Sequence, residues 1–283
     1  MAIKKISVLG TGTMGLGIIH VAALGGMEVV GYDVSQASLD KASKTIRKNM
    51  EKAVELGKAK QADVDAALAR ISYTSEFEKT AAVDMVIEVV PEILQLKIET
   101  FQRLDSLCGP EVYYVSNTSA LSITEMAAAT SRPDKFIGMH FFNPVHKMKL
   151  IEVIRGMETS QETVDIAFEV SRAMGKEPVE VNEYPGFVTT RMNALIGAEA
   201  FRMLENGVAT PEDIDKAIKL GLNHPMGPFE MYDLVGLDGR LRIQTYLYET
   251  LGDHFRPSPL LVNYVKAGRL GRKVGKGIYE YNK

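Results

Sequence analysis

Residues 3–17 of this 283-residue chain read IKKISVLGTGTMGLG and combine three features. A short apolar run ends at Gly10, a glycine-rich turn follows it, and an apolar stretch of helical length continues to residue 24. A second strand-like run, EVVGY, occupies residues 28–32. Apolar runs of these lengths, joined through a glycine-rich turn, predict a β-α-β unit at the start of the chain.

The turn has the pattern GxGxxG, with glycines at Gly10, Gly12 and Gly15. In a Rossmann unit the first glycine permits a tight turn, the second lets the backbone approach a pyrophosphate, and the third lets helix and strand pack closely. The N-terminus of the helix, which includes Thr13 and Met14, supplies unpaired N–H groups to the phosphates. The strand, turn, helix and second strand together predict a dinucleotide-binding site.

Asp33 follows the second strand, 18 residues after Gly15. A carboxylate about 20 residues beyond the motif accepts hydrogen bonds from the ribose of a bound dinucleotide. A 2′-phosphate would meet a like charge at Asp33, and the next residue is Val34 rather than a neutralising arginine. The sequence therefore predicts NAD rather than NADP as the cofactor.

Strand-like and helical segments alternate along the first two thirds of the chain, which predicts a parallel sheet with helices on its faces. The strand signals stop after EPVEV at residues 177–181, and the remainder reads as helices. We expect an α/β protein with an NAD-binding Rossmann domain over residues 1–184 and an all-helical domain over residues 185–283. Two domains also fit the length, since a domain takes about 150 residues.

Composition excludes several classes of protein. The 33 Lys and Arg residues nearly balance the 36 Asp and Glu residues, so the net charge of −3 predicts no nucleic-acid partner. The single cysteine, Cys108, allows neither an internal disulfide nor a thiolate zinc site, as is typical of cytoplasmic proteins. The uncharged stretch 6–27 contains six glycines, which argues against a membrane segment. We expect a cytoplasmic protein that binds no membrane.

A dehydrogenase must remove a hydroxyl proton as the hydride leaves, and histidine is the usual base. Among the five histidines, only His140 ends an apolar strand of the sheet domain, and carboxyl ends of strands are where such sheets bind ligands. His20 lies among apolar residues, which favours packing, whereas His146, His224 and His254 lie in polar or loop-like segments. His140 is the candidate base, with a structural histidine as the alternative.

Several short motifs occur in order along the chain: GTGTMG at 10–15, SNTSALSI at 116–123, HFFNPV at 140–145, KLIEVI at 149–154, PGF at 185–187 and NHPMGP at 223–228. Together they resemble the L-3-hydroxyacyl-CoA dehydrogenase family, and most closely its bacterial members that act on 3-hydroxybutyryl-CoA. The resemblance implies NAD-dependent oxidation of (S)-3-hydroxyacyl-CoA to 3-oxoacyl-CoA and the reverse reduction. It also implies short substrates, 3-hydroxybutyryl-CoA and acetoacetyl-CoA, a role in fatty-acid or butanoate metabolism, and a homodimer formed through a helical substrate and dimerisation domain.

By that resemblance, His140 takes the 3-hydroxyl proton and Glu152 pairs with it. A carboxylate on one ring nitrogen fixes the tautomer and stabilises the imidazolium. Ser119 matches a serine near the substrate hydroxyl and the nicotinamide, and Asn143 matches an asparagine on the cofactor side. Without the resemblance, Glu152 reads as a surface charge and the other two as turn residues.

Glu92, Lys97 and Lys273 also fall on positions that contact NAD in the family. One position departs from the family pattern, because Thr190 stands where an asparagine normally precedes Arg191. A threonine hydroxyl has a shorter reach than an amide, so we expect weaker or water-assisted polarisation of the thioester side of the substrate. Two alternatives remain: a dehydrogenase of a different hydroxy acid, and a family member that binds NAD without turnover.

Overall fold

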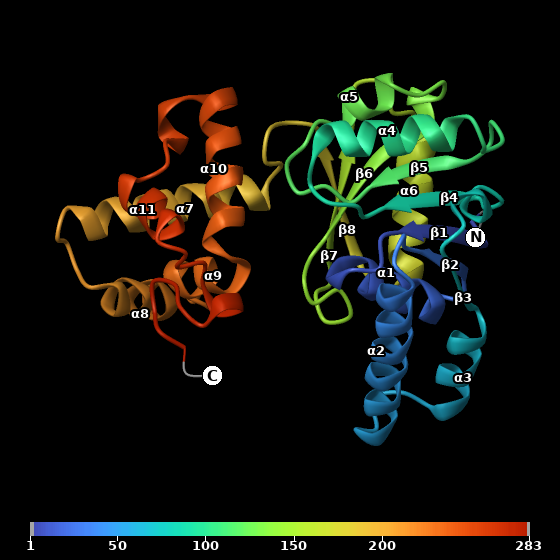
Figure 1. Ribbon diagram of the computed structural model, residues 1–283, viewed down its shortest axis with the longest axis horizontal. Coiled ribbons are helices and arrows are strands. Elements are labelled where there is room, and N and C mark those ends of the chain that lie inside the picture. The colour runs from blue at the N-terminus through green and yellow to red at the C-terminus, as the bar shows by residue number, and fades with distance from the viewer. Residues whose placement is uncertain (1–2, 282–283) are drawn as a thin grey trace. The chain divides into compact units, whose positions relative to one another are not determined.

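The computed structural model describes residues 3–281, and the chain divides into two compact units that join between Tyr184 and Pro185 (Figure 1). The strands of the first unit are β1 (Lys5–Leu9), β2 (Glu28–Tyr32), β3 (Ile71–Thr74), β4 (Met85–Glu88), β5 (Tyr113–Ser116), β6 (Phe136–Phe141), β7 (Leu150–Arg155) and β8 (Glu177–Asn182). Its helices are α1 (Thr13–Leu24), α2 (Gln36–Glu55), α3 (Gln61–Ala69), α4 (Leu94–Asp105), α5 (Ile123–Ala128) and α6 (Gln161–Ala173), with short 3-10 turns at Phe77–Thr80 and Pro133–Lys135.

The eight strands form one sheet in the order β3-β2-β1-β4-β5-β6-β7-β8, and the first six run parallel. The order 3-2-1-4-5-6 is that of a Rossmann sheet, in which the direction of winding reverses between β1 and β4. Ligands of such sheets bind at the carboxyl ends of the strands beside this reversal. The predicted α/β Rossmann fold is therefore confirmed.

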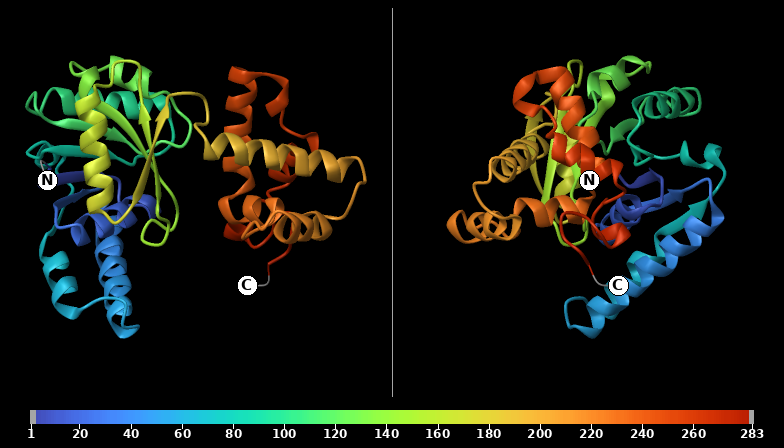
Figure 2. Two further views of the ribbon diagram at one scale, coloured as in Figure 1. Left: turned by 180° about the vertical axis from the view of Figure 1, so that it is seen from behind. Right: turned by 60° about the vertical axis from the view of Figure 1, so that its left-hand side comes forward.

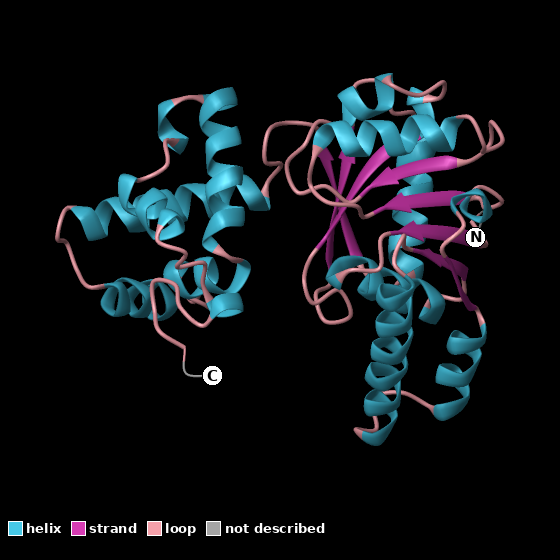
Figure 3. Ribbon diagram, in the orientation of Figure 1, coloured by secondary structure: helices cyan, strands magenta, loops and turns pink. Residues whose placement is uncertain are grey.

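Two strands, β7 and β8, run against the predicted direction. β7 pairs antiparallel with β6, and β8 then pairs parallel with β7, so the expectation of a parallel sheet is wrong at this edge. The reason lies in the connection, because only residues 142–149 separate β6 from β7 and they form no helix (Figure 3). A parallel partner needs a crossover of a dozen or more residues, whereas a short connection turns the chain back on itself.

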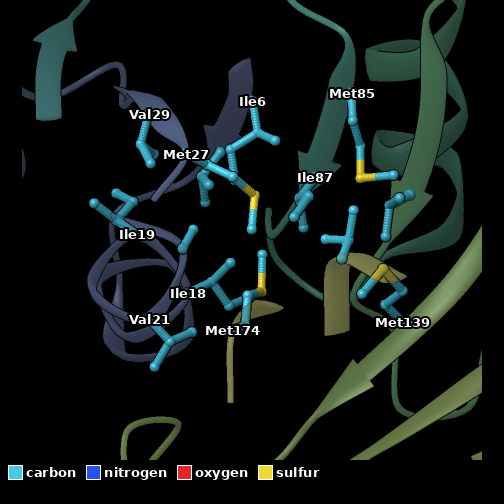
Figure 4. Packing of buried hydrophobic residues seen from close by; sticks show 14 of the residues in the cluster. Ile6, Ile18, Ile19, Val21, Met27, Val29, Met85, Ile87, Met139 and Met174 are labelled. Carbon is cyan, nitrogen blue, oxygen red and sulfur yellow. The ribbon is translucent and has the colours of Figure 1, made fainter. Parts of the chain in front are cut away.

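Helices cover both faces of the sheet (Figures 1 and 2). On one face, alternate strand residues such as Ile6 and Ile87 lie in one apolar cluster with Ile18 of α1 and with Met174, which follows α6 (Figure 4). On the other face, Phe101 of α4 meets Tyr114 of β5 and Phe136 of β6, with ring centroids 5.6 and 4.5 Å from that of Phe101. Burial on both faces explains why the strands read as continuous apolar runs.

The second unit is helical, apart from isolated bridges among residues 271–280. Its helices are α7 (Thr189–Glu205), α8 (Pro211–Gly221), α9 (Pro228–Val235), α10 (Leu237–Leu251) and α11 (Pro259–Lys266), with 3-10 turns at Asp253–Phe255 and Arg272–Val274. The Thr210 hydroxyl accepts from the N–H of Asp213 and caps α8, whose first residue is a proline. The core includes Phe201, Phe229 and Tyr232.

His20 on α1 is buried beneath the connection between β6 and β7. Its ring stacks on that of exposed His146, with centroids 5.7 Å apart. The ammonium of Lys176, also buried, donates to the Val145 and Met148 carbonyls of the same connection. Burial, helped by His146 and Lys176, lowers the pKa of His20 to about 4.

This shift predicts a loss of stability in acid. A histidine with a lowered folded-state pKa stabilises the fold above its unfolded pKa near 6.5, and this contribution is lost as pH falls toward 4. Between pH 7 and 4.5 we expect wild type to lose about 2–3 kcal/mol more in unfolding free energy than His20→Met. Urea unfolding at both pH values measures this difference, and a His254→Gln control should follow wild type. Equal losses for His20→Met and wild type would contradict the prediction.

Candidate active site

The glycine-rich turn lies between β1 and α1, at the carboxyl end of β1. Gly10 has φ of 99°, and a Cβ there would lie 2.7 Å from the Val89 carbonyl oxygen. A Cβ at Gly15 would lie 1.8 Å from the Gly10 oxygen, whereas a Cβ at Gly12 would meet nothing within 4 Å. The first and last glycines are therefore required by the fold, and Gly12 leaves its backbone open to a ligand.

The N-terminus of α1 begins at Thr13, which is exposed, and continues with half-buried Met14. No side chain caps this helix, because the N-cap residue is Gly12. The first N–H groups of the helix thus lack a capping oxygen from the N-cap residue and remain donors for a phosphate.

Asp33, directly after β2, is bonded to the same turn. Its Oδ2 accepts from the N–H and the hydroxyl of Thr11 at 2.9 and 3.0 Å, and its Oδ1 accepts from the N–H of Ser35 at 3.0 Å. A carboxylate has about four lone-pair sites, so it keeps the capacity to accept from ribose hydroxyls. Val34 beside it is 84% exposed and uncharged. The open turn and this anchored carboxylate fit an NAD molecule.

His140 and Glu152 lie directly opposite each other on β6 and β7. The Nδ1 of His140 is 2.7 Å from Oε2 of Glu152, and the carboxylate is completely buried. Because an ionised carboxylate only accepts, Nδ1 carries the hydrogen and Nε2 is the nitrogen that can take a proton. The ring of Phe142 lies 4.4 Å from that of His140, centroid to centroid. The pair has the geometry that an oriented general base requires, at the carboxyl end of a strand.

Glu92 joins the connection after β4 to the loop that carries Ser119. Its Oε1 accepts from the Thr118 hydroxyl at 2.5 Å, and from the Ser119 N–H and hydroxyl at 2.8 and 3.1 Å. The side chain of Glu92 is 37% exposed. Glu92 and Ser119 were both predicted from the sequence to contact the cofactor, and the structure shows that they are hydrogen-bonded to each other.

Lys97, a predicted NAD contact, lies next to Glu92. Its side chain is completely buried, and its ammonium lies 2.7 Å from Oε1 of Glu88 and 3.3 Å from Oε2 of Glu92. Glu88 also accepts from the Ser116 hydroxyl, at 2.6 Å. Burial raises the pKa of Glu88, while the ammonium and this hydroxyl act in the opposite direction.

Asn143 is exposed in the connection between β6 and β7. Sequence reasoning did not single out Asn117, which follows β5. Its Oδ1 accepts from the N–H of Phe141, the last residue of β6, at 2.9 Å and so links the carboxyl ends of these two strands. Glu88 and Thr11 were missed as well. All three lie beside predicted site residues, and the only signal in the sequence was a polar residue at or just beyond the carboxyl end of an apolar strand.

Two predicted residues belong to the helical unit. Thr190 is the second residue of α7 and is 6% exposed. Lys273 lies in the 3-10 turn Arg272–Val274, where its ammonium is 2.6 Å from Oδ1 of Asp238. This ion pair links Lys273 to α10 of its own unit.

Comparison with known proteins is consistent with this geometry. Residues 5–184 match the NAD-binding domain of 3-hydroxyacyl-CoA dehydrogenases, and residues 186–281 match the C-terminal domain of the same enzymes. A probable 3-hydroxybutyryl-CoA dehydrogenase of Bacillus subtilis is 46% identical over 99% of this chain and 98% of its own. The 3-hydroxybutyryl-CoA dehydrogenase of Clostridioides difficile is 45% identical over 99% of this chain and all of its own.

A solved structure shows the same likeness. The (S)-3-hydroxybutyryl-CoA dehydrogenase PaaH1 of Ralstonia eutropha superposes with a TM-score of 0.95 at 42% identity, covering 99% of this chain and all of that one. The chain belongs to the 3-hydroxyacyl-CoA dehydrogenase family. The predicted family and NAD as its cofactor are thereby confirmed.

Proposed function

We propose that this protein oxidises (S)-3-hydroxybutyryl-CoA to acetoacetyl-CoA with NAD and catalyses the reverse reduction. The observation that carries the proposal is the buried His140–Glu152 pair, an oriented base at a strand end of an NAD-binding unit. The substrate is inferred from the names of the full-length relatives. Catalytic roles for His140, Glu152, Ser119 and Thr190 belong to the proposal.

NAD, when bound, accepts the hydride from C3 of the substrate or returns it as NADH. Nε2 of His140 takes the 3-hydroxyl proton during oxidation and gives it back during reduction. Glu152 holds the ring in the tautomer that leaves Nε2 able to accept, and it stabilises the imidazolium that forms. The buried carboxylate acts strongly because little water screens it.

Other residues hold the reactants. The glycine turn and Asp33 bind the adenosine half of NAD, and Ser119 lies near the nicotinamide. Glu92, Asn143 and Lys273 are further contacts of the cofactor. The Ser119 hydroxyl exchanges its hydrogen bond to Glu92 for one to the substrate oxygen at C3. The Thr190 hydroxyl donates to the thioester carbonyl, the role assigned to the amide at this position in the family pattern.

The proposal includes a homodimer that works in the cytoplasm. Whole-length likeness to bacterial dehydrogenases and the buried thiol of Cys108 support this setting. No helix among residues 3–281 is long and apolar enough to cross a membrane.

The proposed function is tested by following NADH absorbance after acetoacetyl-CoA is added to the purified protein. In parallel assays, free acetoacetate replaces the CoA ester and NADPH replaces NADH. We expect turnover with the CoA ester and NADH, and little with either substitute. Turnover of free acetoacetate alone would assign a different hydroxy acid, and NADH binding without any turnover would assign a non-catalytic role.

Selection of NADH over NADPH should depend on Asp33. The double variant Asp33→Ser/Val34→Arg removes the like charge and supplies a partner for a 2′-phosphate. We expect KM for NADH to rise about 10–100-fold, the range for loss of a charged hydrogen bond, and turnover with NADPH to appear. Asp40→Ser, an exposed change on α2, is the matched control and should leave both values unchanged. An unaltered preference in the double variant would refute this role for Asp33.

A further inference from the structure

Lys176 places a buried positive charge beneath the connection between β6 and β7. The residue directly precedes β8 and is 7% exposed. Its ammonium donates to the backbone carbonyl oxygens of Val145 and Met148, to the latter at 2.8 Å. The N–H of the next residue, Glu177, donates to the Lys149 carbonyl oxygen at 2.8 Å. Two consecutive residues therefore bind three carbonyl groups of this connection.

The connection itself, residues 142–149, forms neither a helix nor a strand. It makes a tight turn, in which two of its N–H groups donate to the Pro144 carbonyl oxygen at 2.9 and 3.0 Å. Val145 is buried and packs on α1, because a Cβ at Gly17 would lie 2.7 Å from the Cβ of Val145. The conformation of the connection thus depends on its contacts with α1 and with Lys176.

No acidic side chain among residues 3–281 forms an ion pair with Lys176, and burial lowers the pKa of its ammonium. The ionisable groups beside it are His20 and His146, and burial and Lys176 both lower their pKa values. A buried charge without a counter-ion lowers the free energy of unfolding unless hydrogen bonds offset the loss of water. The carbonyl groups of the connection are therefore the partners that keep this ammonium in place.

The connection that Lys176 binds also carries Asn143, an exposed residue. Asn143 lies two residues before Val145, whose carbonyl group accepts from the Lys176 ammonium. A loop that already has the conformation of the bound state avoids the entropy cost of becoming ordered when its ligand binds. Bonds that fix this connection therefore favour any ligand that Asn143 contacts.

We propose that Lys176 is a positioning residue, which holds the connection between β6 and β7 in one conformation and thereby places Asn143 for NAD. This inference rests on the proposed function, in which Asn143 contacts the cofactor. When only a fraction of the molecules has the binding conformation, the apparent Kd rises by the inverse of that fraction. Without the Lys176 ammonium, we expect about one molecule in ten to keep the connection in place, which corresponds to a Kd about 10-fold higher.

The main test is Lys176→Met, which keeps an unbranched side chain but removes its donors. Kd for NADH is measured by fluorescence titration without substrate, and we expect it to rise about 10-fold. The amides of Lys147 and Met148, which donate to the Pro144 carbonyl, should also exchange their hydrogen faster than in wild type. A wild-type Kd would overturn the proposal, whether or not amide exchange in the connection becomes faster.

A double-mutant cycle tests whether Lys176 acts through Asn143. In the Asn143→Ala background, Lys176→Met should cause little further loss of NADH affinity, because the side chain that the connection places is already absent. Equal losses in the two backgrounds would overturn the proposal, and so would a wild-type Kd in Asn143→Ala. Lys176→Gln, which keeps an amide donor without the charge, replaces Lys176→Met in the cycle if the methionine variant does not fold.

Two control variants separate this effect from changes in charge and in general stability. Lys147→Met removes an exposed charge from the connection and should keep the wild-type Kd. Arg132→Met removes a buried cation that lies 3.0 Å from Asp105 at the end of α4, and it should lower Tm without changing Kd. A rise in Kd as large as that of Lys176→Met in either control would overturn the proposal. Because NADH binding is read without substrate, these outcomes stand even if wild type reduces a different substrate.

Discussion

A His140→Ala variant is expected to reduce acetoacetyl-CoA with a kcat about 10²–10⁴-fold below that of wild type, the usual contribution of a general acid–base. The same variant should bind NADH almost normally, since the imidazole moves a proton and holds no part of the dinucleotide in the proposed mechanism. Steady-state turnover and a separate NADH titration measure the two effects. Loss of NADH binding together with turnover would instead assign His140 a structural role.

Two further variants sharpen this test. His146→Ala removes an exposed histidine from the connection after β6 and should keep nearly all activity. Glu152→Gln retains the size of the side chain but removes the charge that stabilises the imidazolium, so it should lose much of the activity of His140. Combining it with His140→Ala should add little, because the two side chains act as one unit. Full activity in Glu152→Gln would contradict the proposed pairing.

The largest expected effect on stability comes from Asp233→Ala in the helical unit. Asp233 is completely buried at α9, and its carboxylate accepts from the N–H groups of Ile278 and Tyr279 and from the Tyr281 hydroxyl at 2.8–2.9 Å. Alanine leaves these buried and half-buried donors without their acceptor, at a total cost of about 3–5 kcal/mol. We expect the thermal transition of this unit to fall by more than about 10 °C in calorimetry.

The control for this prediction is Asp253→Ala. Asp253 pairs with Arg256 at 2.8 Å, but both side chains are more than half exposed, so the variant should change unfolding by less than about 0.5 kcal/mol. Similar Tm values for the two variants would show that burial of Asp233 does not matter. Because Lys273 lies just before the segment that Asp233 holds, Asp233→Ala should also raise KM for NADH if Lys273 contacts the cofactor.

Short-range patterns in the sequence are sufficient to predict the strands and the helix around the glycine-rich turn. The glycine spacing at 10–15, the strand at 28–32 and the carboxylate at Asp33 predict the β-α-β unit, because each depends on residues close together in the chain. The Ser122 cap of α5 is a local feature of the same kind, with its hydroxyl accepting from the N–H of Glu125. Position alone also placed His140 at a strand end.

The tertiary structure determines which side chains face each other in the candidate site. The reversal of β7 sets Glu152 opposite His140, and no pattern within KLIEVI distinguishes that direction from a parallel one. The same holds for Lys97, which looks like any charged helix residue until α4 packs on the sheet and buries it beside Glu88. Strand direction and burial depend on contacts between residues that are far apart in the sequence. Local sequence therefore determines the helices and strands, whereas packing determines which side chains pair in the candidate site.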